Sequence, residues 1–289
     1  MSELSEFEKE ILKEINKQNL SEKEAKKVIE GLKKPQISKQ QKNKIYFPER
    51  SVKFLAFSDT HMGHKAYRPD IMDKMTKDAK RQKVDFAINC GDTLEGMSGR
   101  EGHIYELTDL GYTQQMKRFG DEFEKFDKVG DNFKVHSIEA QNSHSGWYKN
   151  KGNQGVDIGQ ELEKQNKHYN FLGFDEQKLE LENGLEIGLR HPGGGTAYAL
   201  SYKLQKYINS MSGGQKPHLL FEGHFHKSMY MFYRNIHAFE SGTLADQTPF
   251  MKKKNTPAHI GYWIVEAKLN RNKNKKVERV NSQFVPFFE

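Results

Sequence analysis

Histidine and acidic side chains follow several apolar stretches of the chain, and their types and spacing suit metal binding. The most informative group is Gly223-His224-Phe225-His226, which comes directly after the apolar run Leu219 to Phe221. Two imidazoles two residues apart at the end of a buried strand are typical of a metal site. The alternative is a pair of solvated loop histidines, so the rest of the chain must decide between the two interpretations.

Two further apolar runs end in residues of the same kind. Val52 to Phe57 is expected to form a strand and leads into Ser58-Asp59-Thr60-His61, which offers a carboxylate and an imidazole. Phe86 to Cys90 leads into Gly91-Asp92. The glycine would let the backbone turn tightly and leave the Asp92 carboxylate at the tip of the strand. Both predicted strands therefore end in potential metal ligands.

The pattern occurs twice more along the chain. Phe133 to Ala140 precedes Gln141-Asn142-Ser143-His144, and Leu185 to Arg190 precedes His191. An open α/β sheet binds its ligands outside the carboxyl ends of its strands, so we expect the five strand ends to converge. Asp, His and Asn side chains without a thiolate suit a pair of borderline divalent ions such as Mn, Fe, Ni or Zn. Asp92 is the carboxylate that two such ions could share.

In this order, the motifs resemble those of the calcineurin-like metallophosphoesterase superfamily, whose strands end in Asp-x-His, Gly-Asp, Gly-Asn-His, His and Gly-His-x-His. The resemblance covers roughly residues 50 to 266. It implies an α/β fold, a four-layer αββα sandwich of two mixed sheets, and a dinuclear centre, with Mn preferred, that hydrolyses phosphate esters with a metal-activated water. The ligands that it implies are Asp59, His61 and His226 for one ion, Asn142, His191 and His224 for the other, and Asp92 as the bridge.

One motif departs from the family pattern. The family has glycine, asparagine, histidine and an acid in direct succession, whereas this chain has Gln141, Asn142, Ser143, His144 and Ser145. The histidine is therefore displaced by one position. In the family, this histidine stabilises the transition state or protonates the leaving group. We predict that His144 folds back to that place and is the catalytic residue; if Ser143 takes the place instead, the general acid is missing.

The charge balance bears on the substrate, which the motifs do not fix because loops select it. The net charge of +7 favours polyanionic partners. We therefore expect a phosphate-ester substrate and favour a phosphodiester of nucleic acid or a nucleotide, which would make the protein a nuclease or nucleotide phosphodiesterase. Two alternatives stay open: a phosphomonoesterase acting on a phosphoprotein or small metabolite, and a weakened binding or scaffold protein on the same fold. The full set of seven ligands argues against the scaffold.

Three other features have both a functional and a structural interpretation. His103 could reach the substrate, but we favour a structural role in its glycine-rich loop. Trp147 and Tyr148 could stack on a base, or they could pack a lid. Thr196 can cap a helix that extends to Met211, and the free N–H groups of this helix could face a phosphate oxygen. The glycines before Thr196 could equally serve only to reverse the chain.

The composition suits one large domain with a small appendage. The chain has 289 residues and one cysteine, Cys90, which we interpret as a small buried side chain. A single cysteine excludes an intramolecular disulfide and fits a reducing compartment. No stretch approaches the roughly 18 apolar residues of a membrane span, and the start lacks the features of a signal peptide. We therefore expect a cytoplasmic protein without membrane contact, and we predict no particular oligomeric state.

Residues 1–45 are expected to form a separate module, an N-terminal helical hairpin and linker, and residues 46–289 the metallophosphoesterase domain. A capping box at Ser21 to Glu24 starts the second helix of this hairpin, and Pro35 ends it. The polar stretch Gln36 to Lys44 is the predicted linker. A DNA-binding helix-turn-helix is disfavoured, because glutamates alternate with the lysines as on a solvated helix face.

The remaining helices and strands support an α/β domain. Asp70 can start a helix between the first two strands, and another helix carries Met116, Phe119, Phe123 and Phe126 at helical spacing. After His226 the pattern changes to consecutive strands without helices. Residues 229–233 and 236–240 are predicted to form a hairpin, and residues 260–267 and 277–285 supply further strands. We expect these late strands to build a second sheet.

Overall fold

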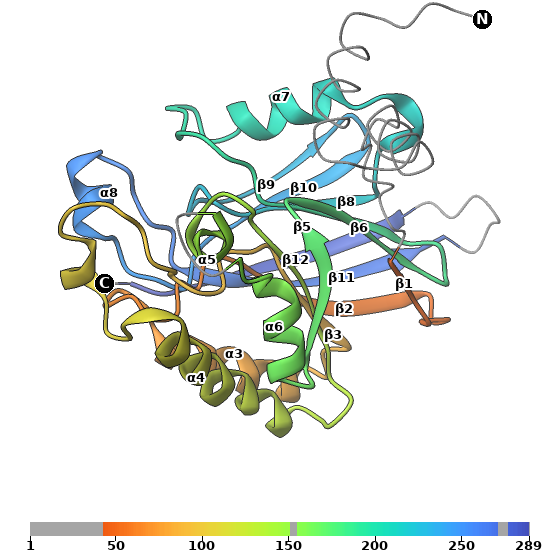
Figure 1. The fold of residues 1–289 in the computed structure, drawn as a ribbon. Coiled ribbons are helices and arrows are strands. Elements are labelled where there is room, and N and C mark those ends of the chain that lie inside the picture. The colour runs from red at the N-terminus through yellow and green to blue at the C-terminus, as the bar shows by residue number, and fades with distance from the viewer. Residues whose placement is uncertain (1–42, 151–154, 271–276, 289) are drawn as a thin grey trace, which may run out of the picture. The chain divides into compact units, whose positions relative to one another are not determined.

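The computed structural model describes residues 43–150, 155–270 and 277–288. Two six-stranded mixed sheets pack against each other (Figure 1). The first, here called the β8 sheet, contains in spatial order β1 (Asn43–Ile45), β6 (Glu176–Leu181), β7 (Glu186–Arg190), β8 (Leu219–Glu222), β10 (Ile236–Ser241) and β9 (Ser228–Tyr233). The second, the β2 sheet, contains β12 (Val277–Pro286), β11 (Gly261–Leu269), β2 (Ser51–Phe57), β3 (Phe86–Asn89), β4 (Val135–Glu139) and β5 (Tyr169–Phe174).

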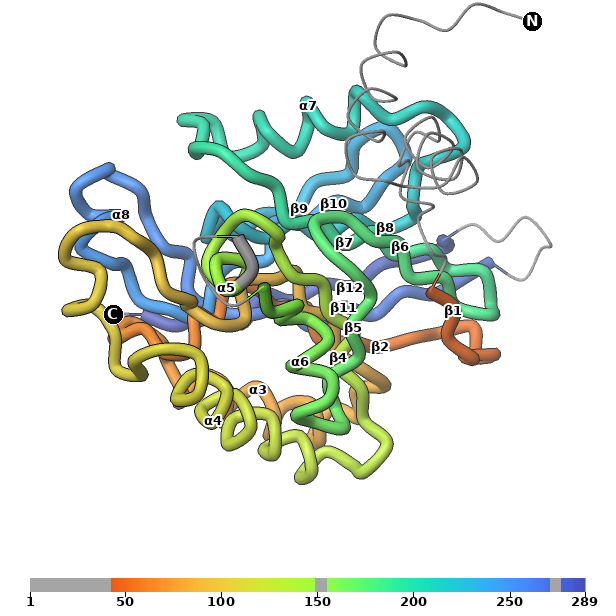
Figure 2. Tube along the Cα trace, viewed as in Figure 1, coloured from red at the N-terminus to blue at the C-terminus, as the bar shows by residue number. Residues whose placement is uncertain are grey.

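Helices cover the outer face of each sheet, as the tube in Figure 2 also shows. The helices α3 (Pro69–Arg81), α4 (Gly111–Phe123) and α6 (Ile158–Gln165) pack on the β2 sheet, and α7 (Tyr202–Ser210) packs on the β8 sheet. The shorter segments α5 (Trp147–Asn150) and α8 (Pro249–Lys253) lie in loops. The order helix, sheet, sheet, helix confirms the predicted four-layer α/β sandwich.

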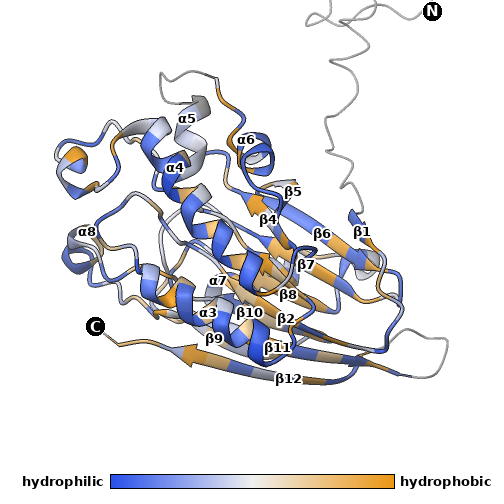
Figure 3. Ribbon diagram, turned by 90° about the horizontal axis from the view of Figure 1, so that it is seen from below, coloured by the Kyte–Doolittle hydropathy of each residue, from blue (hydrophilic) through white to orange (hydrophobic). Residues whose placement is uncertain are grey.

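Strand alternation explains why both faces of each sheet are buried. Successive side chains of a strand point to opposite faces. In β8, Leu219 and Phe221 belong to the apolar cluster between the sheets, whereas Leu220 packs under α7. In β2, Phe54 lies between the sheets and Leu55 faces the helices. Figure 3 shows this division, with apolar residues along the strands and polar residues on the exposed helix faces. Each such side chain contributes about 1.5–3 kcal/mol when it is fully buried.

Two helix predictions hold and one is wrong. Asp70 lies in the first turn of α3, and α4 carries the predicted apolar face, with Phe126 buried in the 3-10 turn that follows it. The helix predicted to begin at Thr196 instead begins at Tyr202 as α7, and Ser201 before it makes no side-chain cap. Thr196 therefore lies in a loop, and the first turn of α7 is separated from the predicted ligand His191 by that loop.

The late strands do not form a sheet of their own, which corrects the prediction. β9 and β10 form the predicted hairpin, and Arg234 and Asn235 at its turn have φ angles of 48° and 66°. β10 then pairs in parallel with β8, whereas β11 pairs antiparallel with β2. The reason lies in the side chains: the Phe239 ring of β10 stacks on Phe221 of β8 at 4.5 Å between centroids. The late strands thus complete both sheets.

The N-terminal helical hairpin predicted for residues 1–45 lies outside the described residues, except for its last three. Asn43–Ile45 form β1, which pairs in parallel with β6. The predicted linker, Gln36 to Lys44, therefore ends inside a strand, and the sheet begins before residue 46. Among the residues that the structure describes, no helix has the length and apolar character needed to cross a membrane.

Candidate metal centre

Six of the seven predicted ligands meet where strand ends of the two sheets come together, and the seventh, Asn142, lines an adjoining cavity. The prediction assumed five strands of a common core, but three of the strands belong to the β2 sheet and two to the β8 sheet. Backbone hydrogen bonds hold the ends in place, from Asp59 N to the Gly91 carbonyl and from Gly223 N to the Arg190 carbonyl, each 3.0 Å. The strand ends that contribute are β2 with Asp59 and His61, β3 with Asp92, β4 with Asn142 to His144, β7 with His191, and β8 with His224 and His226.

Asp59, His61 and His226 form the first cluster of potential ligand atoms, which lie within 4.8 Å of one another. Nε2 of His61 is 2.9 Å from Nε2 of His226, which is 3.4 Å from Oδ1 of Asp59. His61 donates its Nδ1–H to Glu95 at 2.9 Å, so Nε2 of the neutral ring carries a lone pair. Two imidazole nitrogens that face each other beside a carboxylate suit a shared cation.

Asp92, His191 and His224 form the second cluster. His191 donates its Nδ1–H to the Cys90 carbonyl at 2.6 Å, and its Nε2 lies 3.1 Å from Oδ2 of Asp92. This Nε2 is buried and faces the Asp92 carboxylate, which helps to raise the pKa of the ring to about 10 against the effect of burial. His224 donates its Nε2–H to the Gly194 carbonyl at 2.8 Å, which leaves Nδ1 with a lone pair. Metal-binding histidines usually hold their second ring nitrogen in this way.

The charges of the centre also suit divalent cations. Asp59 and Asp92 are buried, with 0% and 1% of their surface exposed. Burial raises the pKa of each carboxyl group, but the imidazoles of His226 and His191 outweigh it and hold both pKa values below the usual range. Burying a carboxylate is costly unless a positive charge compensates it. The donor set of carboxylates and imidazoles with free ring nitrogens therefore fits two divalent ions.

The backbone of the centre is strained. A residue other than glycine in the left-handed region costs on the order of 1–3 kcal/mol and persists only where the surrounding structure fixes it. In the described part of the chain, six of the eleven such residues belong to the centre. Their φ angles are 53° for Asp59, 51° for His61, 51° for Asp92, 36° for His144, 75° for His224 and 53° for His226.

Two glycines allow the strand ends to approach closely. A Cβ atom on Gly91 would lie 2.8 Å from Nδ1 of His191, and Gly91 has φ of 101°. A Cβ atom on Gly223 would lie 2.2 Å from Oγ of Ser58 and 3.0 Å from Oδ2 of Asp59. Any side chain at these positions would push a ligand out of place.

The displaced motif brings His144 to the centre. The centroid of its ring lies 4.3 Å from that of His61, and its Nε2 is 3.9 Å from Oδ2 of Asp92. Its Nδ1 is 3.2 Å from Oε2 of Glu95. Ser143 reaches the centre as well, because its hydroxyl donates to Oδ1 of Asp92 at 2.8 Å. The His144 imidazole and the Ser143 hydroxyl therefore both lie beside Asp92, each next to a different carboxylate oxygen.

Glu95 is the site residue that the sequence analysis missed. It is buried, accepts hydrogen bonds from Nδ1 of His61 and from Nε2 of His103 at 2.7 Å, and lies beside His144. Burial raises the pKa of Glu95, but these imidazoles, His144 above all, bring it well below the usual value. Glu95 thus orients three rings. An acid three residues after Asp92 was the only signal in the sequence that could have found it.

His103 and Asn142 are placed at the border of the centre. His103 is buried, and its Nδ1 accepts from Ser98 N at 3.3 Å while its Nε2 donates to Glu95. It therefore contacts the centre through Glu95. Asn142 lines a cavity together with His191 and His224, and its carbonyl accepts from Nε1 of Trp147 at 3.2 Å.

A buried network behind Asp92 holds its loop. The Thr93 hydroxyl donates to the Glu139 carboxylate and accepts from Nδ2 of Asn89 at 2.8 Å. The Tyr169 hydroxyl donates to the same Glu139 carboxylate at 2.6 Å. Burial raises the pKa of Glu139 despite these hydrogen bonds. The network ties the end of β3 to β4 and β5 and fixes the position of Asp92.

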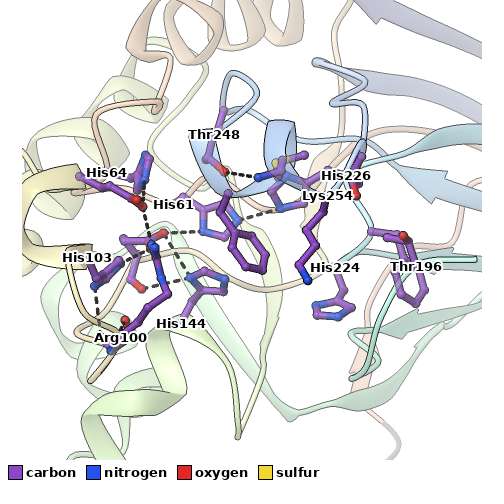
Figure 4. Close-up of a pocket in the computed structure, with 18 of the residues that line it drawn as sticks. His61, His64, Arg100, His103, His144, Thr196, His224, His226, Thr248 and Lys254 are labelled. Carbon is purple, nitrogen blue, oxygen red and sulfur yellow. Dashed lines mark hydrogen bonds and ion pairs between the residues drawn. The ribbon is translucent and has the colours of Figure 1, made fainter.

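Two cavities adjoin the centre, and both include Gly194 and His224. The larger has a volume of about 680 Å³ and is drawn in Figure 4. The smaller has a volume of about 520 Å³. Residues of the centre line part of the larger cavity, namely His61, Glu95, His144 and His226, and its other walls include Arg100, Phe250 and Lys254. The smaller cavity is lined by Asn142, Ser143, Asp175, Arg190 and His191.

The chain was compared with protein families, curated sequences and solved structures, and only solved structures matched it. No family model and no curated protein sequence matches the chain. Among solved structures, an archaeal phosphodiesterase is 13% identical, with 81% of this chain and 100% of that one covered and a TM-score of 0.44. Vps29 from Entamoeba histolytica with Zn is 9% identical (81% and 99% covered, TM-score 0.42). A predicted phosphoesterase from Streptococcus pneumoniae is 11% identical (83% and 99% covered, TM-score 0.38).

Proposed function

We propose that the protein is a metal-dependent phosphoesterase with a dinuclear centre, and that it hydrolyses a phosphodiester of nucleic acid or a nucleotide. The observation that carries this proposal is the convergence of buried carboxylates and imidazoles with free ring nitrogens at one point. Asp59, His61 and His226 would hold one ion, Asn142, His191 and His224 the other, and Asp92 both. Mn is the expected ion, and Fe, Ni and Zn suit the same donors.

The ions, when bound, would supply an activated water as nucleophile and would neutralise charge on the phosphoryl oxygens. His144 is the proposed general acid. Burial lowers its pKa, but the carboxylates of Glu95 and Asp92 raise the pKa to about 9. Glu95 holds Nδ1 and leaves Nε2 on the side of Asp92. A protonated imidazole in this place can donate to the leaving oxygen.

The two cavities support a diester rather than a monoester. They meet at Gly194 and His224, beside the centre, and so offer room for an ester group on either side of phosphorus. A monoester has only one such group and would leave one cavity without a function. The smaller cavity has polar side chains such as Asn142, Ser143 and Arg190 in its wall, and the larger one adds Arg100 and Lys254; these groups suit a substrate with hydroxyl and phosphate groups.

The test compares hydrolysis of bis(4-nitrophenyl) phosphate and 4-nitrophenyl phosphate in the presence of Mn. We expect turnover of the diester, its loss in Asp92→Asn, and no change in Asp121→Asn, an exposed aspartate on α4. Turnover of the monoester alone would favour a phosphomonoesterase. Bound Mn without hydrolysis of either compound would favour a scaffold protein.

A further inference from the structure

We propose that α8 and the residue after it form a nucleotide-binding wall of the larger cavity, where Phe250 stacks on an unpaired base and Lys254 contacts a backbone phosphate of single-stranded nucleic acid. The inference rests on the proposed phosphoesterase function and names the substrate of that site. It concerns residues outside the metal centre.

The short helix α8 presents both side chains to one cavity. Thr248 caps the helix, because its hydroxyl accepts from Met251 N at 3.2 Å, and Met251 is buried. Lys254 N donates to the Phe250 carbonyl at 3.2 Å, so the two residues are fixed relative to each other. The backbone of α8 is therefore held, while the side chains of Phe250 and Lys254 line the cavity.

Lys254 is the cation of the cavity that is available to a substrate. Figure 4 shows its side chain extending into the cavity, with the ammonium on the side of His224. No ion pair or hydrogen bond of its Nζ occurs within residues 43–150, 155–270 and 277–288. Arg100 also lines the cavity but differs, because its guanidinium pairs with Glu106 at 2.5 Å. A free ammonium beside a phosphate-hydrolysing centre suits a phosphate of the substrate.

Phe250 offers an aromatic surface next to this cation. Half of its surface is exposed, and the Arg100 guanidinium lies over its ring at 5.6 Å from the centroid. An exposed aromatic ring in a positively charged groove is the usual arrangement for binding single-stranded nucleic acid, because every base has a face that can stack. The ring and the Lys254 ammonium therefore match the base and a phosphate of a nucleotide.

The geometry favours a single strand over a duplex. Both faces of a paired base are covered by its neighbours, so only an unpaired or flipped base can stack on Phe250. The volume of about 680 Å³ lies within the range of roughly 300–1,000 Å³ for small-ligand sites and suits nucleotide units.

Binding of a fluorescein-labelled single-stranded oligonucleotide tests the inference, with the full-length Asp92→Asn protein in EDTA and fluorescence anisotropy as the measurement. Phe250→Ala should raise Kd about tenfold. Lys254→Gln should make the slope of log K against log salt shallower by about 0.7, the value for one phosphate contact on a single strand. The matched controls Phe232→Ala, an exposed ring on β9, and Lys80→Gln, on α3, should change neither quantity.

The outcomes separate this inference from the proposed function. Equal Kd values for Phe250→Ala and the parent protein, or tighter binding of a duplex than of the single strand, would overturn the nucleotide-binding wall. Phe250→Ala could weaken binding while the protein with Asp92 intact hydrolyses neither aryl ester nor oligonucleotide in Mn. That result would support the nucleotide-binding wall and contradict the phosphoesterase function. Hydrolysis of the aryl diester without any binding of oligonucleotide would overturn the wall alone.

Discussion

Two buried acidic clusters lie near the strand ends, and they differ in what compensates their charge. Imidazoles surround Asp59 and Asp92 and keep the pKa of both carboxyl groups low. On the outer face of the β8 sheet, Glu222 and Glu240 are neighbours in register, and Arg190 pairs with Glu222. Burial, together with the adjacent Glu222, raises the pKa of Glu240 to about 8 against the opposing effect of Lys227. Burial beside another carboxyl group favours the neutral form, whereas neighbouring imidazoles favour the charged form, which can bind a cation.

The largest expected effect is on activity: a substitution beside the metal centre should lower it, and one in the Glu222 and Glu240 cluster should not. His144→Ala should lower kcat for the aryl diester by about 10²- to 10⁴-fold, because it removes the proposed general acid. Mn content should stay unchanged, since His144 is not a proposed ligand. Glu240→Gln should leave kcat within about twofold. A His144→Ala enzyme with the parent rate would end the proposed role of this residue.

Removal of the carboxylate that orients the rings should have the next largest effect. Glu95→Gln should lower metal affinity or kcat by about 10- to 100-fold, the usual cost of losing a residue that supports metal ligands. Gln cannot accept from His61, His103 and His144 as a carboxylate does. Mn titration followed by the rate at saturating Mn separates the two contributions. An unchanged affinity together with an unchanged rate would contradict the role of Glu95.

The titration of Glu240 should make the stability of the protein depend on pH. Folding raises the pKa of Glu240 from about 4.5 to about 8, so the folded protein binds a proton between these pH values. The free energy of unfolding should therefore fall as the pH rises through this range. Between pH 5 and pH 8.5 in EDTA, the parent protein should lose about 4 kcal/mol more than Glu240→Gln in urea unfolding, at about 1.4 kcal/mol per pKa unit. Equal losses would show that Glu240 does not titrate in this range.

The smallest effect concerns the network behind Asp92. Tyr169→Phe removes the hydroxyl that donates to Glu139, and it should lower the free energy of unfolding by about 1 kcal/mol. Activity should fall by less than about threefold, because Thr93 still holds Glu139. Urea unfolding and the diester assay check both expectations. A loss of activity as large as that of Glu95→Gln would place Tyr169 closer to catalysis than the structure does.

The positions of the ligands were predictable because each follows an apolar run directly. Asp59, Asp92, His191 and His224 all lie at the ends of observed strands. The division of these strands between two sheets was not predictable, because alternation along a strand says which residues are buried and not which strands pair. The late strands show this, since Phe239 packs on Phe221 of the β8 sheet.

Other features have no local pattern in the sequence. Glu95 gains its place from rings that come from three separate segments, and a single acid gives no periodic signal. β6 was missed because it has only two buried apolar residues, Leu179 and Leu181, so its alternation is too short to indicate a strand. The helix predicted from Thr196 starts later, where Leu204 and Ile208 can pack on Leu220. Tertiary contacts override the local capping preference there.

The central claim is that this cluster of side chains binds two divalent ions. The most direct measurement is the stoichiometry of bound Mn, by equilibrium dialysis and elemental analysis of the full-length protein. We expect two Mn per chain in the parent protein, at most one in Asp92→Asn, and two in Asp121→Asn. A parent protein that binds no Mn, or that binds two Mn in the presence and absence of the Asp92 carboxylate alike, would contradict the claim.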